Sequence, residues 1–222
     1  LMSDKARMGK EDLLIDRHEG IAQSAGLMTL LGVDRASAEQ IAVSAADWID
    51  SDSVPGPGGA EDDYYSRFTP PYLAANNLMA DPSELRMVNA VTPAIYARLR
   101  PWLCTLPTTA LSPLNINTLL PGQALLIAML APDKLGIEQA RQVLAQRPAD
   151  GYGSVEAFWN QRVLAALGLS DDVRQQVQPK SRWFKVALAA DLGGDVVDET
   201  VLYDASQRPA RAVRRQWGTG GD

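Results

Sequence analysis

Hydrophobic positions recur at helical spacing over most of this chain and at strand spacing near its end. From Gly20 to about residue 178, apolar residues lie three and four positions apart, which is the spacing of an amphipathic helix. After Gln178 and Pro179, apolar and polar residues alternate, as they do in a half-buried strand. The pattern predicts an α+β protein in which a large helical region precedes an antiparallel sheet.

Three pairs of short helices are predicted in the helical region, each pair joined by a short turn. Capping signals mark several helix starts: Ser37 with Gln40 forms a capping box, Asp81 with Glu84 forms another, and Ser154 is a good N-cap residue. The turns that separate the helices within each pair are predicted at 32–34, 89–91 and 131–134.

The C-terminal alternation predicts an antiparallel meander of three strands, at 183–190, 197–203 and 211–217. In the first strand, Phe184, Val186 and Leu188 share one face and Lys185 lies on the other. Three strands alone are marginally stable, so we expect a helix to cover them. The pattern leaves no helix free for this role, which suggests that the natural protein has a further N-terminal part.

Composition narrows the classes of function. The chain has 222 residues, a net charge of −6 and a pI near 4.9, which disfavours binding to a polyanion. Its one cysteine, Cys104, excludes an intrachain disulfide, and no run of 18 apolar residues is present. Residues 1–19 are mostly polar and charged, and their pattern predicts little structure.

A stretch rich in carboxylates interrupts the helical region. A helix that carries Ile41 and Trp48 must end before the Pro-Gly-Pro-Gly-Gly segment at 55–59. Acidic residues flank this turn on both sides, and folding it would bring like charges together unless a cation lies between them. The acidic residues are Asp47, Asp50 and Asp52 before the turn, and Glu61, Asp62 and Asp63 after it.

Calcium suits such a loop because it binds carboxylate and backbone oxygens. The loop is not an EF-hand, since Pro55 stands where that motif requires glycine, and it holds neither the His nor the Cys typical of a zinc site. The alternative is a solvated acidic loop whose aspartates cap neighbouring helices. The residues alone leave both interpretations open.

Catalytic signatures are not apparent. His18 and Cys104 are too few and too differently placed to suggest a nucleophile with its base, and an isolated Cys beside Trp102 is most often simply packed. No Walker loop or His-Glu-x-x-His motif is present, so we expect no enzyme. The helical hairpins raise an alternative, a helix-hairpin-helix nucleic-acid-binding protein, but the predicted turns lack paired glycines and the region is not basic.

Several blocks, in one order along the chain, resemble general secretion pathway protein K, the large minor pseudopilin of type II secretion. The resemblance covers roughly residues 20–217, and the family's prepilin leader and long hydrophobic N-terminal helix are not in this sequence. The blocks are Asp-Trp-Ile-Asp-Ser-Asp at 47–52, Gly-Ala-Glu-Asp at 59–62, Pro-Tyr-Leu-Ala-Ala-Asn at 71–76, Ser-Glu-Leu-Arg at 83–86, Leu-Pro at 106–107, Leu-Asn-Ile-Asn-Thr at 114–118 and Arg-Pro at 147–148.

The resemblance implies a pseudopilin-like antiparallel sheet with a large inserted all-α domain of SAM-like or helix-hairpin-helix-like hairpins. It divides the chain into an N-terminal segment of the pseudopilin body at 1–19, the inserted domain at 20–178 and a β-meander at 179–222. It also implies calcium in the inserted domain, for which Asp50, Asp52, Glu61, Asp62 and Asp63 are the expected ligands.

The same resemblance implies a non-enzymatic role at the tip of the type II secretion pseudopilus. The expected partners are minor pseudopilins I and J in a heterotrimer, with the major pseudopilin below and no nucleic acid. The chain would be the periplasmic part of a bacterial protein anchored in the inner membrane through its missing N-terminal helix, and it would help to start pseudopilus assembly for protein export.

Overall fold

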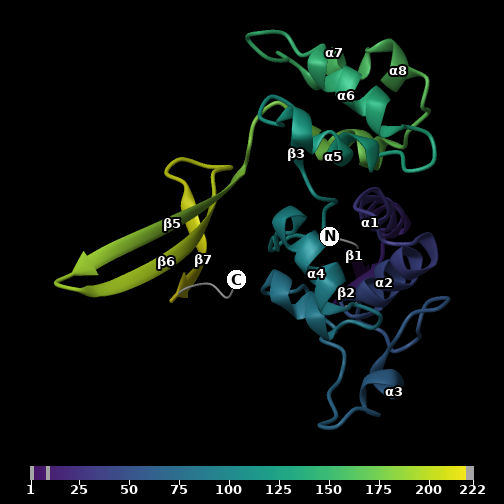
Figure 1. The fold of residues 1–222 in the computed structure, drawn as a ribbon, viewed down its shortest axis with the longest axis vertical. Helices are drawn as coiled ribbons and strands as arrows, with labels where there is room; N and C mark the ends of the chain where they lie inside the picture. The colour runs from purple at the N-terminus through teal and green to yellow at the C-terminus, as the bar shows by residue number, and fades with distance from the viewer. Residues whose placement is uncertain (1–2, 9–10, 219–222) are drawn as a thin grey trace.

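The computed structural model describes residues 3–8 and 11–218, and within them it combines many short helices with three small sheets (Figure 1). Short helices joined by turns and loops make up about half of the stretch from His18 to Gln176, and an antiparallel sheet follows. The predicted α+β class with an antiparallel sheet is confirmed. The divisions at 1–19, 20–178 and 179–222, and the SAM-like description of the helical region, stay predictions.

The first sheet was not predicted. Strands β1 (Ser3–Met8) and β2 (Glu11–Asp16) pair antiparallel, although their polar sequence gave no clear alternation. β2 is tied to the helical region because the backbone N–H of Leu14 donates to Ser51 Oγ, and the N–H of Ser51 donates to the Leu14 carbonyl, both at 2.9 Å. This hairpin therefore braces the acidic stretch.

Helices α1 (His18–Leu30) and α2 (Arg35–Asp47) pack side by side around a turn at Gly32, whose φ of +84° favours glycine. The predicted capping box at Ser37 and Gln40 is wrong. Asp34 caps α2, and its carboxylate accepts a 2.9 Å bond from the N–H of Ser37, which already lies inside the helix. Asp34 stands three residues before Ser37 and so satisfies this N–H first.

Other capping predictions hold. Asp81 and Glu84 form the predicted box, although the helix they open, η1, is a 3₁₀ helix, and the Ser154 hydroxyl caps α7. The remaining elements are short. They are α3 (Asp62–Tyr65), η1 (Pro82–Met87), α4 (Pro93–Leu99), η2 (Arg100–Trp102), η3 (Pro121–Gln123), α5 (Leu125–Ala128), α6 (Ile137–Ala145), α7 (Val155–Trp159), α8 (Arg162–Ala165) and α9 (Asp171–Gln176).

The helices bury two hydrophobic clusters. We call them the N-terminal cluster, which includes Met28, Ile41, Ile49, Tyr65 and Leu99, and the C-terminal cluster, which includes Leu27, Ile116, Ile127, Phe158 and Val177. α1 contributes to both, since its neighbouring residues 27 and 28 enter different clusters. The two clusters therefore meet along this helix.

A short parallel pair closes the segment that holds most of the C-terminal cluster. β3 (Leu114–Asn115) pairs with β4 (Val177–Gln178), and the N–H of Ile116 donates to the Gln178 carbonyl at 3.1 Å. The Asn117 amide adds bonds of 3.1 Å to the carbonyls of Tyr152 and Pro179. The two ends of this segment are thus joined to each other.

The C-terminal sheet agrees closely with its prediction. Its strands are β5 (Trp183–Leu192), β6 (Asp195–Asp204) and β7 (Arg211–Trp217), paired antiparallel in chain order. Gly193 and Gly194 form the first turn with φ of +71° and +104°. In Figure 1 this sheet projects away from the helices as a curved ribbon.

The two faces of the sheet differ. On the inner face, the Arg214 guanidinium donates to the Ala80 carbonyl and to Thr105 Oγ1. The other face, which we call the outer face, presents apolar side chains that are exposed at Phe184, Leu188, Val197 and Trp217. At these four positions the described residues do not supply the helical cover that the sequence led us to expect, although Val201 on the same face is buried. None of the helices in the described part of the chain is long and apolar enough to span a bilayer.

Candidate metal centre

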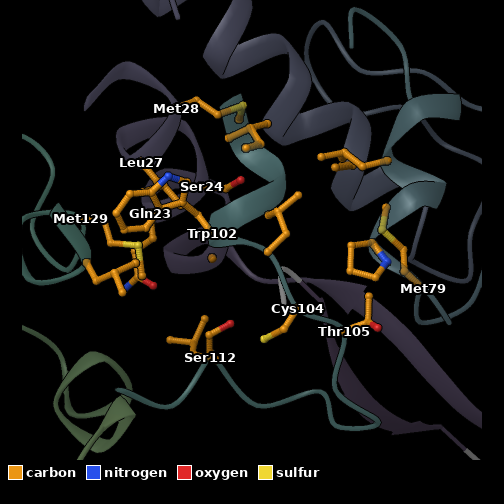
Figure 2. A pocket seen from close by; sticks show the side chains of 18 of the residues that line it. Gln23, Ser24, Leu27, Met28, Met79, Trp102, Cys104, Thr105, Ser112 and Met129 are labelled. Atoms are coloured by element: carbon orange, nitrogen blue, oxygen red, sulfur yellow. The ribbon is translucent and has the colours of Figure 1, made fainter. Parts of the chain in front are cut away.

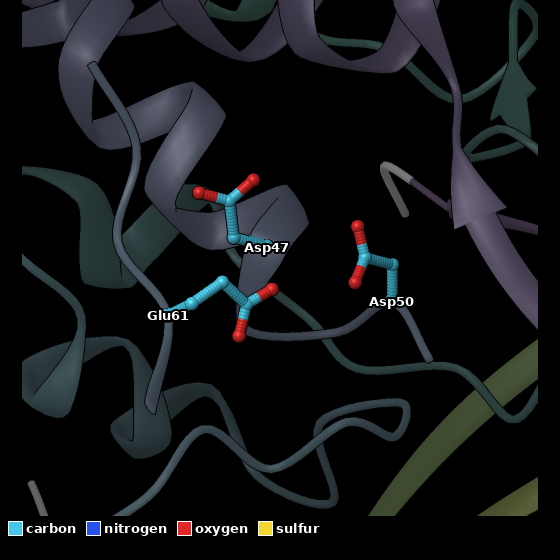
Figure 3. Close-up of side chains that lie close together, drawn as sticks. All are labelled: Asp47, Asp50 and Glu61. Carbon is cyan, nitrogen blue, oxygen red and sulfur yellow. The ribbon is translucent and has the colours of Figure 1, made fainter. Parts of the chain in front are cut away.

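Three buried carboxylates converge where α2 ends and the acidic loop returns (Figure 3). Each of Asp47, Asp50 and Glu61 offers an oxygen, and these three oxygens all lie within 4.8 Å of one another. Their residues are exposed by 0%, 3% and 3%, so water screens the charges poorly. Three like charges this close destabilise the fold unless a cation or a proton neutralises part of the charge.

Asp47 organises the loop. Its Oδ1 accepts from the N–H of Gly56 at 3.0 Å and its Oδ2 accepts from the N–H of Ala60 at 2.7 Å, so one carboxylate holds both ends of the glycine-rich turn. Gly59 lies directly against this carboxylate, and a Cβ built there would overlap it. A glycine is therefore needed at this position for close approach to the end of α2.

Glu61 is the electrostatically strained member. Neither of its carboxylate oxygens has a hydrogen-bond partner in the structure, although both are buried. Burial, followed by the negative charges of Asp47, Asp62 and Asp52, raises the pKa of Glu61 to about 7. A buried carboxylate with both oxygens unpartnered is costly, and a bound cation would remove that cost.

Aromatic packing holds the two sides of the loop in place. Trp48, which follows Asp47, meets Tyr65 edge to face with ring centroids 5.2 Å apart, and Tyr65 stacks on Tyr72 at 5.3 Å. The N–H of Asn76 donates to the Trp48 carbonyl at 3.0 Å. The side-chain oxygen of Asn76 is buried without a hydrogen-bond partner, as are both carboxylate oxygens of Glu61.

The structure divides the predicted ligand set. Asp50 and Glu61 lie in the cluster, whereas the Oδ1 of Asp52 accepts from the N–H of Val54 at 2.8 Å in a local turn. The Oδ1 of Asp62 accepts from the N–H of Ala74 at 2.9 Å, and Asp63 is exposed. The five-residue set stays a prediction, with Asp52 and Asp62 close enough to act on the charge of Glu61.

Sequence reasoning counted Asp47 among the flanking acids but left it out of the ligand set. A usable signal was its spacing of three from Asp50, which places the two side chains on the same side of a helical turn. The unpartnered side-chain oxygen of Asn76 had no comparable signal, because an isolated Asn in a loop is common.

The donor atoms indicate the type of ion. The clustered side chains offer only carboxylate oxygens, which hard cations prefer, and the surrounding loop can add backbone carbonyls. Buried acids, unpartnered Glu61 oxygens and a glycine-rich loop fit calcium better than magnesium, which usually keeps several waters and demands octahedral geometry. Such a site would fix the loop to the end of α2.

Together, the fold and the site define an α+β protein in which a buried carboxylate cluster lies against a loop of the helical region. Two family models described as type II secretion system (T2SS), protein K, match residues 12–108 and 114–180. The chain belongs to the type II secretion system protein K family.

Curated relatives agree with this family. Type II secretion system protein K of Pectobacterium carotovorum subsp. carotovorum is 35% identical over 192 residues, which cover 86% of this chain and 58% of that protein. The protein of the same name from Aeromonas hydrophila is 39% identical over 168 residues, 75% of this chain and 50% of that protein. The chain thus spans little more than half the length of these relatives.

A solved structure shares the fold. A chain of the crystal structure of the GspK-GspI-GspJ complex from the enterotoxigenic Escherichia coli type 2 secretion system superposes with a TM-score of 0.76 at 24% identity. The match covers 98% of this chain and 84% of that chain. The helix-hairpin-helix nucleic-acid alternative receives no support from these similarities.

Proposed function

We propose that this chain is the periplasmic part of a minor pseudopilin that caps the tip of the type II secretion pseudopilus and promotes its assembly. The observation that carries the proposal is the agreement over nearly the whole chain, in family and in fold, with protein K and with a chain of the GspK-GspI-GspJ complex. In this role it is a non-enzymatic architectural subunit of protein export.

The partners in this proposal are minor pseudopilins I and J, with the major pseudopilin below. The outer face of the C-terminal sheet supports such assembly, because exposed apolar side chains on one sheet face are typical of a surface that packs against another element. A helix preceding residue 1 would pack on the same body and anchor the protein in the inner membrane. The helical region is much bulkier than the sheet (Figure 1), which suits a terminal position better than an internal one.

The proposal includes a structural calcium ion. Asp47, Asp50 and Glu61 would hold it, with the side-chain oxygen of Asn76 as a neutral candidate ligand. Calcium would supply positive charge to a buried acidic cluster and so fix the 50–62 loop against α2. The aspartates at 52, 62 and 63, which the family resemblance also implicates, would shape the loop and its electrostatic potential.

Co-purification tests the assembly. The chain is mixed with the soluble parts of I and J and passed over a sizing column, where we expect one peak that contains all three. The variant Leu188→Asp places a charge on the outer face and should weaken or abolish the complex. Ala189→Lys is the matched control, because the next residue on β5 points to the opposite face and pairs with Asp198.

Failure of the wild-type chain to join either I or J would contradict the proposal. If Ala189→Lys disrupted the complex as strongly as Leu188→Asp, the outer face would not be the contact surface, although the assembly itself would stand. A far-UV circular dichroism spectrum of each variant checks that the sheet still forms.

A further inference from the structure

A cavity of about 290 Å³ lies where the two hydrophobic clusters meet, and none of the three clustered carboxylates lines it (Figure 2). One wall is α1, and the other walls come from α2, from residues between 79 and 85, from the segments at 102–105 and 111–114, and from α5. The cavity is roughly twice the ~150 Å³ of an engineered apolar cavity that binds benzene. Its size therefore suits a molecule with two fused rings or a short alkyl chain.

The lining is chiefly hydrocarbon and sulfur. Trp102 lines one side, and the side chains of Met28, Met79 and Met129 reach the cavity from three different parts of the chain (Figure 2). Methionine is flexible and polarisable, so such walls adapt to apolar and aromatic ligands. Further apolar lining residues are Leu27, Ile41, Ile49, Leu99, Leu103 and Leu126.

Several polar groups of the wall are bonded to residues behind it. The amides of Gln23 and Gln176 exchange two hydrogen bonds of 2.7 and 2.9 Å, and Gln176 also donates to the Ser112 carbonyl. The Thr105 hydroxyl donates to the Ala80 carbonyl. These groups leave little for a charged ligand or for a stable cluster of water, which needs two to four polar partners per molecule.

We propose that this cavity is a binding site for a small, neutral, largely hydrocarbon ligand of about the size of naphthalene. A ligand that enters the cavity removes its apolar wall from water and makes dispersion contacts with it. Because Leu27 and Met28 line the cavity from opposite clusters, the ligand would bridge the two halves of the helical region. The inference does not depend on the secretion role.

The single cysteine, Cys104, allows ligand binding in the cavity to be measured. Cys104 lines the cavity and is exposed enough to meet a reagent, so a bound ligand should shield its thiol. The probe is 1-naphthylamine, which has the two fused rings of the proposed ligand, is neutral at pH 7 and changes its fluorescence in apolar surroundings. We expect a saturable fluorescence change, and at ten times the probe's Kd the alkylation of Cys104 by iodoacetamide should slow roughly tenfold.

Variants locate the binding. Ser24 lies half-buried on the α1 wall, so Ser24→Leu should fill the cavity, raise the melting temperature and abolish both the fluorescence change and the protection of Cys104. Ser24→Ala, which adds no volume, should bind the probe as the wild type does. Leu188→Asp should also leave binding intact, because it alters only the outer face of the sheet.

Unchanged Cys104 alkylation at saturating probe would overturn the proposal, and this arm needs no variant. Loss of the fluorescence change in Leu188→Asp with retention in Ser24→Leu would overturn it as well, by moving the binding to the sheet. Lack of any saturable binding up to the solubility of the probe would have the same meaning.

Discussion

The helical region and the C-terminal sheet differ in how much of their apolar surface they bury. The helices enclose two clusters in which residues such as Ile116, Ile127 and Phe158 are wholly buried. The sheet has nearly ideal alternation, yet Phe184, Leu188 and Trp217 remain 47%, 50% and 67% exposed. A strong local pattern thus forms a sheet without completing a core, whereas weakly patterned short helices form two cores by packing together.

The largest contrast should come from deleting one large side chain in each region. Phe158→Ala removes a ring that packs on Tyr152 and Trp159, with centroids 5.5 and 5.0 Å away, and should cost about 3 to 5 kcal/mol of unfolding free energy. Leu188→Ala on the sheet should cost less than about 1 kcal/mol. Urea unfolding followed by circular dichroism measures both, and equal losses would mean that the outer face is already covered, for instance by self-association.

The pH dependence of the unfolding free energy tests the electrostatic repulsion around Glu61 in the helical region. Without calcium, the pKa of Glu61 is about 7 in the folded state against a usual 4.5. Between pH 4.5 and 7, the Glu61 carboxyl is therefore protonated in the folded state and ionised in the unfolded state. Stability should therefore fall as pH rises from about 4.5 to beyond 7, by up to about 3 kcal/mol. Thermal melts across this range check it, and Glu61→Gln should flatten the slope; a slope equal to that of the wild type would argue against Glu61 as its source.

Calcium should act on the helical region and leave the sheet unchanged. At a calcium concentration one hundred times the Kd, the ion adds about 2.7 kcal/mol, so a chelator should lower the melting temperature and calcium should restore it. Asp50→Ala and Glu61→Ala should lose this response. Asp63→Ala should keep it, because Asp63 lies outside the buried cluster.

Hydrogen exchange gives the regional readout of the same experiment. Added calcium should protect amides near residues 47–62 and leave those of β5, β6 and β7 unchanged. A melt that does not move after complete metal removal would count against the site, and a response lost in Asp63→Ala would favour the ligand set predicted from the sequence over the observed cluster.

The smallest expected effect lies at the junction of the two regions. Arg214→Ala removes the contacts of β7 with the Ala80 carbonyl and with the Thr105 hydroxyl, and should cost about 1 kcal/mol. Exchange should speed up in β7 and near residue 105. Arg211→Ala is the matched control on the same strand, and similar exchange in both variants would mean that Arg214 does not hold the sheet.

The sequence was informative wherever structure follows from neighbouring residues. Alternation placed the three C-terminal strands within a few residues of their ends, and the signals at Asp81 and Ser154 found true caps. It failed where the partner is distant. The β1–β2 hairpin has little apolar alternation, and the β3–β4 pair consists of two residues on each side, more than sixty positions apart.

For the candidate site too, the sequence predicted local features but not the contacts between distant residues. Charge and glycine content correctly drew attention to the loop, because crowded carboxylates beside a helix end need neutralisation. Which acids converge depends on the path of the turn, and that path is set by hydrogen bonds from Gly56 and Ala60 to Asp47. Asp52 does not join the cluster, because its carboxylate accepts a hydrogen bond from the nearby backbone N–H of Val54.

The β3–β4 pair has a consequence for how this architecture can vary. Since the chain leaves at Asn115 and returns at Val177 as an adjacent parallel strand, everything between them is a lobe whose two ends are joined, and which packs on α1 through one face. Lengthening, shortening or exchanging the lobe would leave the entry and exit points where they are. This joining of the two ends thus lets one part of the molecule diversify while the carboxylate loop and the terminal sheet keep their positions.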